Sequence, residues 1–216
     1  LKKYMTRKKI VFTLLFCGLV LVGCAMVGPL MSDVEKPKYQ VTSLADSIEL
    51  RSYDPMIVAA VQVNGKRKEA IGEGFRILAD YIFGNNTLEQ NISMTAPVQQ
   101  QSGETIAMTA PVQQQKNSNF WTISFVMPKM YTLKTIPKPN NKEVILYEVP
   151  AQKFIAIRFS GTNSDDNIEQ HERTLFNFIK QNKIKVVGES KYAFYNPPWT
   201  LPFMRRNEIM MQIPDD

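Results

Sequence analysis

The sequence contains two copies of one pattern of strands and a helix, separated by 96 residues. Residues 48–65 align without gaps with residues 144–161. The matched pairs are Leu50 with Leu146, Ala60 with Ala156, Val61 with Ile157, and Gly65 with Gly161. Alternate positions in the later part of each copy are apolar, which is the period of a half-buried strand. Each copy therefore predicts two strands joined by a turn, at Asp54-Pro55 in the first and at Pro150-Ala151 in the second.

A helix is predicted after each copy, and a further strand after each helix. The first helix carries one apolar stripe at helical spacing, made of Ile71, Phe75, Leu78, Ala79 and Ile82. The second begins at Asp165 or Asp166 and turns an apolar face inward, made of Ile168, Leu175, Phe178 and Ile179. The further strands begin near Ile92 and near Ser190.

The order strand, strand, helix, strand is thus the same in both halves of the chain. It predicts an α+β fold in which two related halves pack about a pseudo-twofold axis. We expect the strands to form one curved sheet or open barrel, with both helices laid against it.

A shorter repeat lies between the halves. Residues 92–101 recur as residues 106–115 with one difference, and residues 102–104 supply a turn. Alternating apolar residues in both copies predict a hairpin with one apolar face, and the alternation continues from Trp121 to Met127. Because Pro97 and Pro111 each remove a backbone donor, we expect sheet edges or bulges there.

The start of the chain has the three parts of an export signal. Five basic residues precede an apolar run from residue 10 to 22, which is too short to cross a bilayer that needs about 20 residues. The run ends in Leu21-Val22-Gly23-Cys24, which resembles the lipobox of bacterial lipoproteins and implies acylation of Cys24. The alternatives are an ordinary cleaved signal and an uncleaved anchor.

These features predict a signal peptide over residues 1–23, a lipid-anchored tether over 24–38 and a domain over 39–216. The expected location is the cell envelope. Ala25 after the anchor favours the outer membrane, facing the periplasm, in a Gram-negative cell. Without the signal peptide the 26 basic residues fall to 26 − 5 = 21, against 20 acidic residues. The mature chain is nearly neutral, so we expect no nucleic-acid partner.

Several motifs together resemble the SOUL haem-binding protein family over roughly residues 39–214. They are the Met-Thr-Ala-Pro-Val segments, Ser124-Phe125-Val126-Met127-Pro128, Tyr195-Asn196-Pro197-Pro198-Trp199 and Arg205-Arg206-Asn207-Glu208-Ile209. The resemblance implies a distorted antiparallel β-barrel of two pseudo-symmetric β-β-α-β halves flanked by two long helices. It also implies reversible, non-catalytic binding of haem or another tetrapyrrole.

The resemblance further implies an apolar groove beside the first helix, for which Phe75, Leu78 and Ile82 are the candidate ligand-binding residues. Haem iron takes an axial His, Met, Cys or Tyr, and His171 is the one histidine of the chain. His171 lies at the border of the second helix's apolar face, so a half-buried helix residue is the alternative to an axial ligand.

Arg205 and Arg206 are candidates for pairing with ligand carboxylates, since guanidinium groups offer a planar fork of donors. The alternative is that they tie a loop to the sheet through Glu208 and backbone carbonyls. The loop of residues 196–204 is apolar, and we expect it either to plug the end of the barrel or to line a ligand mouth.

Patterns of catalytic and metal-binding residues are scarce in the sequence. His and Cys do not cluster as zinc ligands, and there is no readable nucleophile with its base. We therefore expect no metal site and no enzyme, but a membrane-tethered haem- or tetrapyrrole-binding protein. The alternative is an envelope interaction or scaffold lipoprotein that keeps the fold and binds no haem, or binds another apolar ligand.

Overall fold

The computed structural model describes residue 12 and residues 34–88, 90–102 and 120–214. The predicted signal peptide, the acylation site Cys24 and the second Met-Thr-Ala-Pro copy at 106–115 lie outside these residues.

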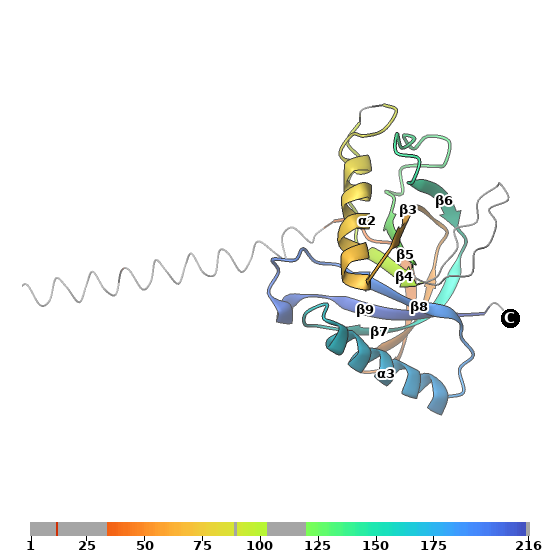
Figure 1. Ribbon diagram of the computed structural model, residues 1–216. Helices are drawn as coiled ribbons and strands as arrows, with labels where there is room; N and C mark the ends of the chain where they lie inside the picture. The colour runs from red at the N-terminus through yellow and green to blue at the C-terminus, as the bar shows by residue number, and fades with distance from the viewer. Residues whose placement is uncertain (1–11, 13–33, 89, 103–119, 215–216) are drawn as a thin grey trace, which may run out of the picture.

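Figure 1 shows two helices packed against a strongly twisted sheet. The elements are β1 (Tyr39–Ala45), β2 (Ile48–Tyr53), β3 (Met56–Asn64), α2 (Arg67–Ile82), β4 (Val98–Ser102), β5 (Phe120–Val126), β6 (Ile145–Val149), β7 (Gln152–Phe159), α3 (Asp165–Gln181), β8 (Val187–Phe194), η1 (Pro202–Met204) and β9 (Asn207–Ile213).

The nine strands form one antiparallel sheet in the order β1-β2-β7-β9-β8-β4-β5-β3-β6. The strand order itself has twofold symmetry. Exchanging β2 with β6, β3 with β7, β4 with β8 and β5 with β9 reverses the order of these eight strands and leaves every neighbour unchanged. The two related halves predicted from the sequence repeat are confirmed, with β1 added at one edge.

The strand register follows the same symmetry. Tyr53 of β2 lies opposite Gln152 of β7, and shifting both by the 96-residue offset gives Val149 opposite Met56, which is the observed pair of β6 and β3. The first two strands of a half therefore do not pair with each other, because each pairs with a strand of the other half. This exchange makes the two halves one sheet that cannot be divided.

Both helices cover the same face of the sheet. Helix α2 packs on the buried side chains Ala59, Val61, Val63, Ile123 and Phe125, and α3 packs on Ile155, Ile157, Phe159, Ile209 and Met211. The expected inward residues of α3 are confirmed, since Ile168, Leu175 and Ile179 are buried and Phe178 is partly buried. We call the opposite side of the sheet the inner face.

The predicted apolar stripe of α2 is partly wrong. The buried residues are Ala70, Gly74, Leu78, Tyr81 and Ile82. Gly74 lies so close to β5 that a Cβ atom placed on it would come within 2.8 Å of the Ile123 side chain. This contact turns the helix so that Phe75 lies at the edge of the interface with 39% of its surface exposed.

The strand expected to begin near Ile92 begins only at Val98. It pairs with β5 on one side and with β8 on the other, and the expected hairpin partner at 106–115 lies outside the described residues. Barrel closure is not confirmed. Among the described strands, β1 and β6 are the two edges of the sheet. Within the same residues, no helix is long and apolar enough to span a bilayer.

Candidate functional site

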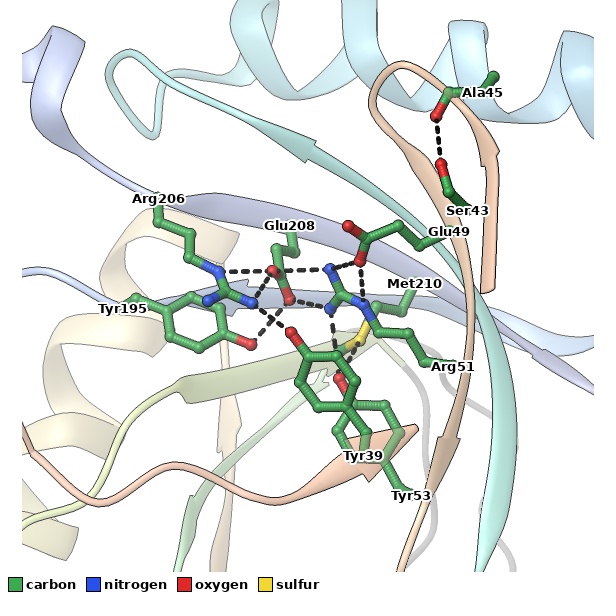
Figure 2. A network of polar contacts seen from close by, with 10 residues as sticks. All are labelled: Tyr39, Ser43, Ala45, Glu49, Arg51, Tyr53, Tyr195, Arg206, Glu208 and Met210. Atoms are coloured by element: carbon green, nitrogen blue, oxygen red, sulfur yellow. Dashed lines mark hydrogen bonds and ion pairs between the residues drawn. The ribbon is translucent and has the colours of Figure 1, made fainter. Parts of the chain in front are cut away.

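A buried polar network occupies the inner face of the sheet (Figure 2). Its centre is the ion pair between Arg51 of β2 and Glu208 of β9, and both side chains are fully buried. Arg51 donates from Nη1 to Glu208 Oε2 at 2.5 Å and from Nη2 to Oε1 at 3.0 Å. Tyr195 donates its hydroxyl to the same carboxylate at 2.7 Å. Glu49 completes the charge balance by accepting from Arg51 Nε at 2.8 Å.

Arg206 joins this network from the loop that precedes β9. Its Nε donates to Glu208 Oε1 at 2.7 Å, and its Nη2 donates to the Tyr39 hydroxyl at 2.8 Å. The guanidinium also lies 4.2 Å from the centre of the Tyr195 ring. The network therefore ties the start of β1 to β2, β9 and the end of β8.

The charges in the network control its protonation. Burial alone would raise the pKa of Glu208, but the hydrogen bonds and charge of Arg51, with the charge of Arg206, hold that pKa below its ordinary value. Burial first, and then the Glu208 charge, raise the pKa of Tyr195. Glu208 therefore stays ionised and Tyr195 stays protonated near neutral pH. The network thus has the character of a structural tie.

The two arginines predicted as ligand-binding residues make protein contacts. Arg205 donates to the carbonyl oxygens of Thr200 at 2.7 Å and Pro198 at 2.5 Å, so it holds the loop before β9. Arg206 belongs to the network around Glu208. These contacts are the ones that the alternative interpretation of the sequence described.

A cleft lies at the end of the sheet, and we call it the sheet-end cleft. Its volume is about 350 Å³, within the range of small-molecule sites. It is lined by residues 35–38, 54–57, 126–129 and 131–133, with Thr95 and Glu148. The segment before β1 forms one wall, because Ala96 N donates to Glu35 O at 3.0 Å and Lys129 N donates to Glu35 Oε1 at 3.0 Å.

The lining of the sheet-end cleft is apolar at its base and charged at its rim. Met56, Ile57, Val126 and Met127 supply the apolar base, and the last two are buried. Three exposed lysines stand at the rim, together with three carboxylates. The lysines are Lys36, Lys38 and Lys129, and the carboxylates are Glu35, Asp54 and Glu148. Such a cleft can hold a flat apolar ring whose acidic groups reach the rim.

A second cleft of about 270 Å³ lies over the inner face. Four glutamines line it, with Phe154 below and charged groups such as Lys191 beside them. Its lining is more polar than that of the sheet-end cleft, so it suits an apolar ring less well.

The predicted groove beside α2 is filled by protein. Leu78 and Ile82 are buried in the interface between the helix and the sheet, and Phe75 packs edge-on against Phe125 with ring centres 5.4 Å apart. None of the three lines either cleft. Of the three, only Phe75 is accessible to a ligand in this conformation.

His171 lies on α3, and its position is that of a half-buried helix residue. Its ring stacks on Phe159 with centres 4.1 Å apart, and Nδ1 lies 2.7 Å from the carbonyl oxygen of Asn167. It lines neither cleft. The part of the chain that the structure describes contains no group of three His, Cys, Asp or Glu residues able to hold a metal ion.

Comparison with known proteins identifies the family. A family model described as SOUL heme-binding protein matches residues 34–212. The chain belongs to the SOUL family. Heme-binding protein 2 of Homo sapiens is 29% identical over 168 residues, covering 76% of this chain and 77% of that protein. Heme-binding protein 2 of Mus musculus is 27% identical over 169 residues, with the same coverage.

Solved structures share the SOUL-type fold of this chain at low sequence identity. The C-terminal domain of EcmrR has a TM-score of 0.56 at 12% identity, covering 82% of this chain and 99% of that one. A hydrolase from Listeria innocua has a TM-score of 0.51 at 11% identity, covering 78% and 92%. At this identity the likeness concerns the fold alone.

The residues of the sheet-end cleft are the ones that the sequence did not reveal. Lys36, Met56 and Lys129 come from three separate segments, and only the strand pairing brings them together. The buried pair had a weak signal, because Arg51 and Glu208 are charged residues inside strands. A charge at such a position indicates either a partner across the sheet or a solvated face.

Proposed function

We propose that this protein binds haem or a related tetrapyrrole in the sheet-end cleft, without catalysing a reaction. Membership of the SOUL family carries the ligand class, and the relatives are named for haem binding. The chemistry of the cleft supports the location. A tetrapyrrole is a flat apolar ring with acidic side groups, and the cleft combines an apolar base with Lys36, Lys38 and Lys129 at its rim.

The cleft also offers side chains that haem iron accepts. Met56, Met127 and Tyr131 line it, and thioether and phenolate groups are both known axial ligands. His171 lies on α3 and lines neither cleft. The protein would therefore hold iron through one of these three residues or hold the ring by its faces and acidic groups alone.

The proposed setting is the cell envelope. Acylation of Cys24 would hold the domain at a membrane, at the outer membrane facing the periplasm in a Gram-negative cell. The support is the lipobox-like sequence, together with its distance of ten residues from Val34, where the described domain begins. Neither the near-neutral mature chain nor the lining of the clefts calls for a nucleic-acid partner.

Titration of the mature chain with hemin, followed by absorbance, tests the binding. We expect a saturable shift of the haem band at micromolar hemin, with albumin as a comparison for nonspecific uptake. Replacing the three rim lysines by glutamate should weaken binding about ten-fold or more, since each loses an attraction to an acidic group and gains a repulsion. The matched control makes the same lysine-to-glutamate change at three exposed positions on and after α3, which are Lys180, Lys183 and Lys185. This control should bind hemin as the unmodified chain does.

The rival function is a scaffold lipoprotein that binds no haem. The filled interface between α2 and the sheet is the observation that favours it, because Leu78 and Ile82 leave no groove there. The absence of a saturable shift in the unmodified chain would remove the haem proposal, and it would leave this rival or a protein that binds another apolar ligand. Equal weakening by both lysine variants would show that net charge, and no defined site, attracts hemin.

A further inference from the structure

The loop between β8 and β9 exposes an unusual amount of apolar surface. Trp199 is 60% exposed and Phe203 is 74% exposed, with Leu201 between them also exposed. The sequence predicted that this loop would plug a barrel or line a ligand mouth. These three side chains are exposed, so they do not plug the sheet, and they line neither of the two clefts described above.

The loop is held in one conformation by its own contacts. Thr200 N donates to Pro197 O, and Gly161 N donates to Pro202 O at 2.9 Å. Arg205 donates to the carbonyl oxygens of Pro198 and Thr200, and Thr200 itself is buried. These contacts anchor the loop backbone at both ends, so the exposed aromatic side chains stand on a held segment.

The base of this loop lies beside the start of the described domain. Val34 and Tyr39 pack on the cluster that contains Tyr195, the residue directly before the loop. Arg206, directly after the loop's last turn, donates to the Tyr39 hydroxyl. Cys24 precedes Val34 by ten residues, which can span at most about 35 Å. An acyl chain on Cys24 would therefore keep a bilayer within reach of the loop.

We propose that residues 197–204 insert into the bilayer surface to which acylated Cys24 attaches the protein. This inference rests on the lipid anchor of the proposed function and is independent of haem binding. Tryptophan prefers the membrane interface, and Leu201 and Phe203 supply apolar surface that gains by leaving water. A lipid anchor at the end of a tether leaves the orientation of the domain free, and insertion of the loop would fix that orientation at the membrane surface.

Fluorescence of Trp199 tests the insertion. The full mature chain is recovered from membranes and placed in vesicles of phosphatidylethanolamine and phosphatidylglycerol, with or without bromine on the acyl chains. The chain has two tryptophans, so subtracting the spectrum of Trp199→Ser isolates Trp199. We expect brominated lipids to quench this emission several-fold more than they quench the remaining Trp121.

Two variants separate insertion from general stickiness. Phe203→Ser should reduce quenching of Trp199, whereas Phe83→Ser, which removes a 64% exposed ring at the end of α2, should leave it unchanged. Equal Trp199 emission with and without bromine overturns the proposal, as does recovery of the chain without acyl groups on Cys24. Hemin titration of Trp199→Ser should match the unmodified chain, so failure of haem binding and failure of insertion are told apart.

Discussion

Replacing Glu208 by glutamine should strongly destabilise the fold, because this carboxylate balances two arginines inside the protein. Glu208 accepts two hydrogen bonds from Arg51, one from Arg206 and one from Tyr195. An amide of the same shape removes the negative charge and turns one acceptor into a donor that faces other donors. Breaking a fully buried ion pair by neutralising one partner costs about 3–5 kcal/mol.

This cost is large compared with the total stability of a domain, which is about 5–15 kcal/mol. For a domain of this size, each kcal/mol of lost stability lowers the midpoint of thermal unfolding by about 2–4 °C, so the expected decrease in this midpoint is about 6–20 °C. Urea denaturation followed by circular dichroism measures the free energy of unfolding. The matched control is Glu169→Gln, because Glu169 pairs with Arg173 at 3.5 Å on the exposed face of α3. That pair should contribute less than about 1 kcal/mol.

The same variant has a defined pH dependence. The pKa of Glu208 is lower in the folded chain than its ordinary value of 4.5. As the pH falls, the unfolded chain takes up a proton first, so this stabilisation is complete above about pH 4.5 and is lost toward the folded-state pKa. The stability difference between the unmodified chain and Glu208→Gln should shrink from pH 7 to pH 3. A difference below about 1 kcal/mol at pH 7, or one that does not change with pH, would refute the reasoning.

Two further predictions test the packing of α2 and the role of the histidine. Gly74→Ala should destabilise the protein by about 1–3 kcal/mol in urea denaturation, because its new Cβ atom would lie 2.8 Å from the Ile123 side chain. Gly72 has open space around it, so Gly72→Ala should stabilise the protein by about 0.5–1 kcal/mol. Equal effects of the two substitutions would mean that α2 does not approach β5 so closely. His171→Ala should leave the absorbance spectrum of the hemin-loaded chain unchanged, because the imidazole ring stacks on Phe159 and lines neither cleft. Loss of a low-spin spectrum in this variant would identify His171 as the axial ligand.

The internal repeat allowed the two halves to be predicted, because both copies must bury the same pattern of strands and helix. The pairing of strands could not be predicted in the same way. Apolar alternation says which face of β2 or β3 is buried, but it does not say whether β2 pairs with β3 or with β7. Which strands pair between the halves is decided by packing between segments that lie about one hundred residues apart in the sequence.

The rotation of α2 shows how a single contact overrides a pattern. Apolar spacing placed Phe75 on the buried face, but the close approach at Gly74 moves it to the edge of that face. Similarly, Ile92 and Ala96 alternate with polar residues and are buried, although neither lies in a strand. A buried loop can thus imitate the period of a strand.

The candidate site was the part least accessible from the sequence. The groove expected beside α2 depended on Leu78 and Ile82 having an open side, and tight packing against β3 and β5 removes it. The sheet-end cleft is assembled from loops at the ends of separate strands. Its position follows from the sheet register, which the sequence pattern does not contain.

Nuclear magnetic resonance of the isotope-labelled mature chain tests most directly where the tetrapyrrole binds. Bound hemin carries unpaired electrons, which broaden the amide signals of nearby residues. We expect selective loss of signals from residues 35–38, 54–57 and 126–133, while signals of α2 around Phe75 persist. Broadening centred on α2 with an unaffected cleft would contradict the proposed site, and unchanged spectra throughout would contradict haem binding itself.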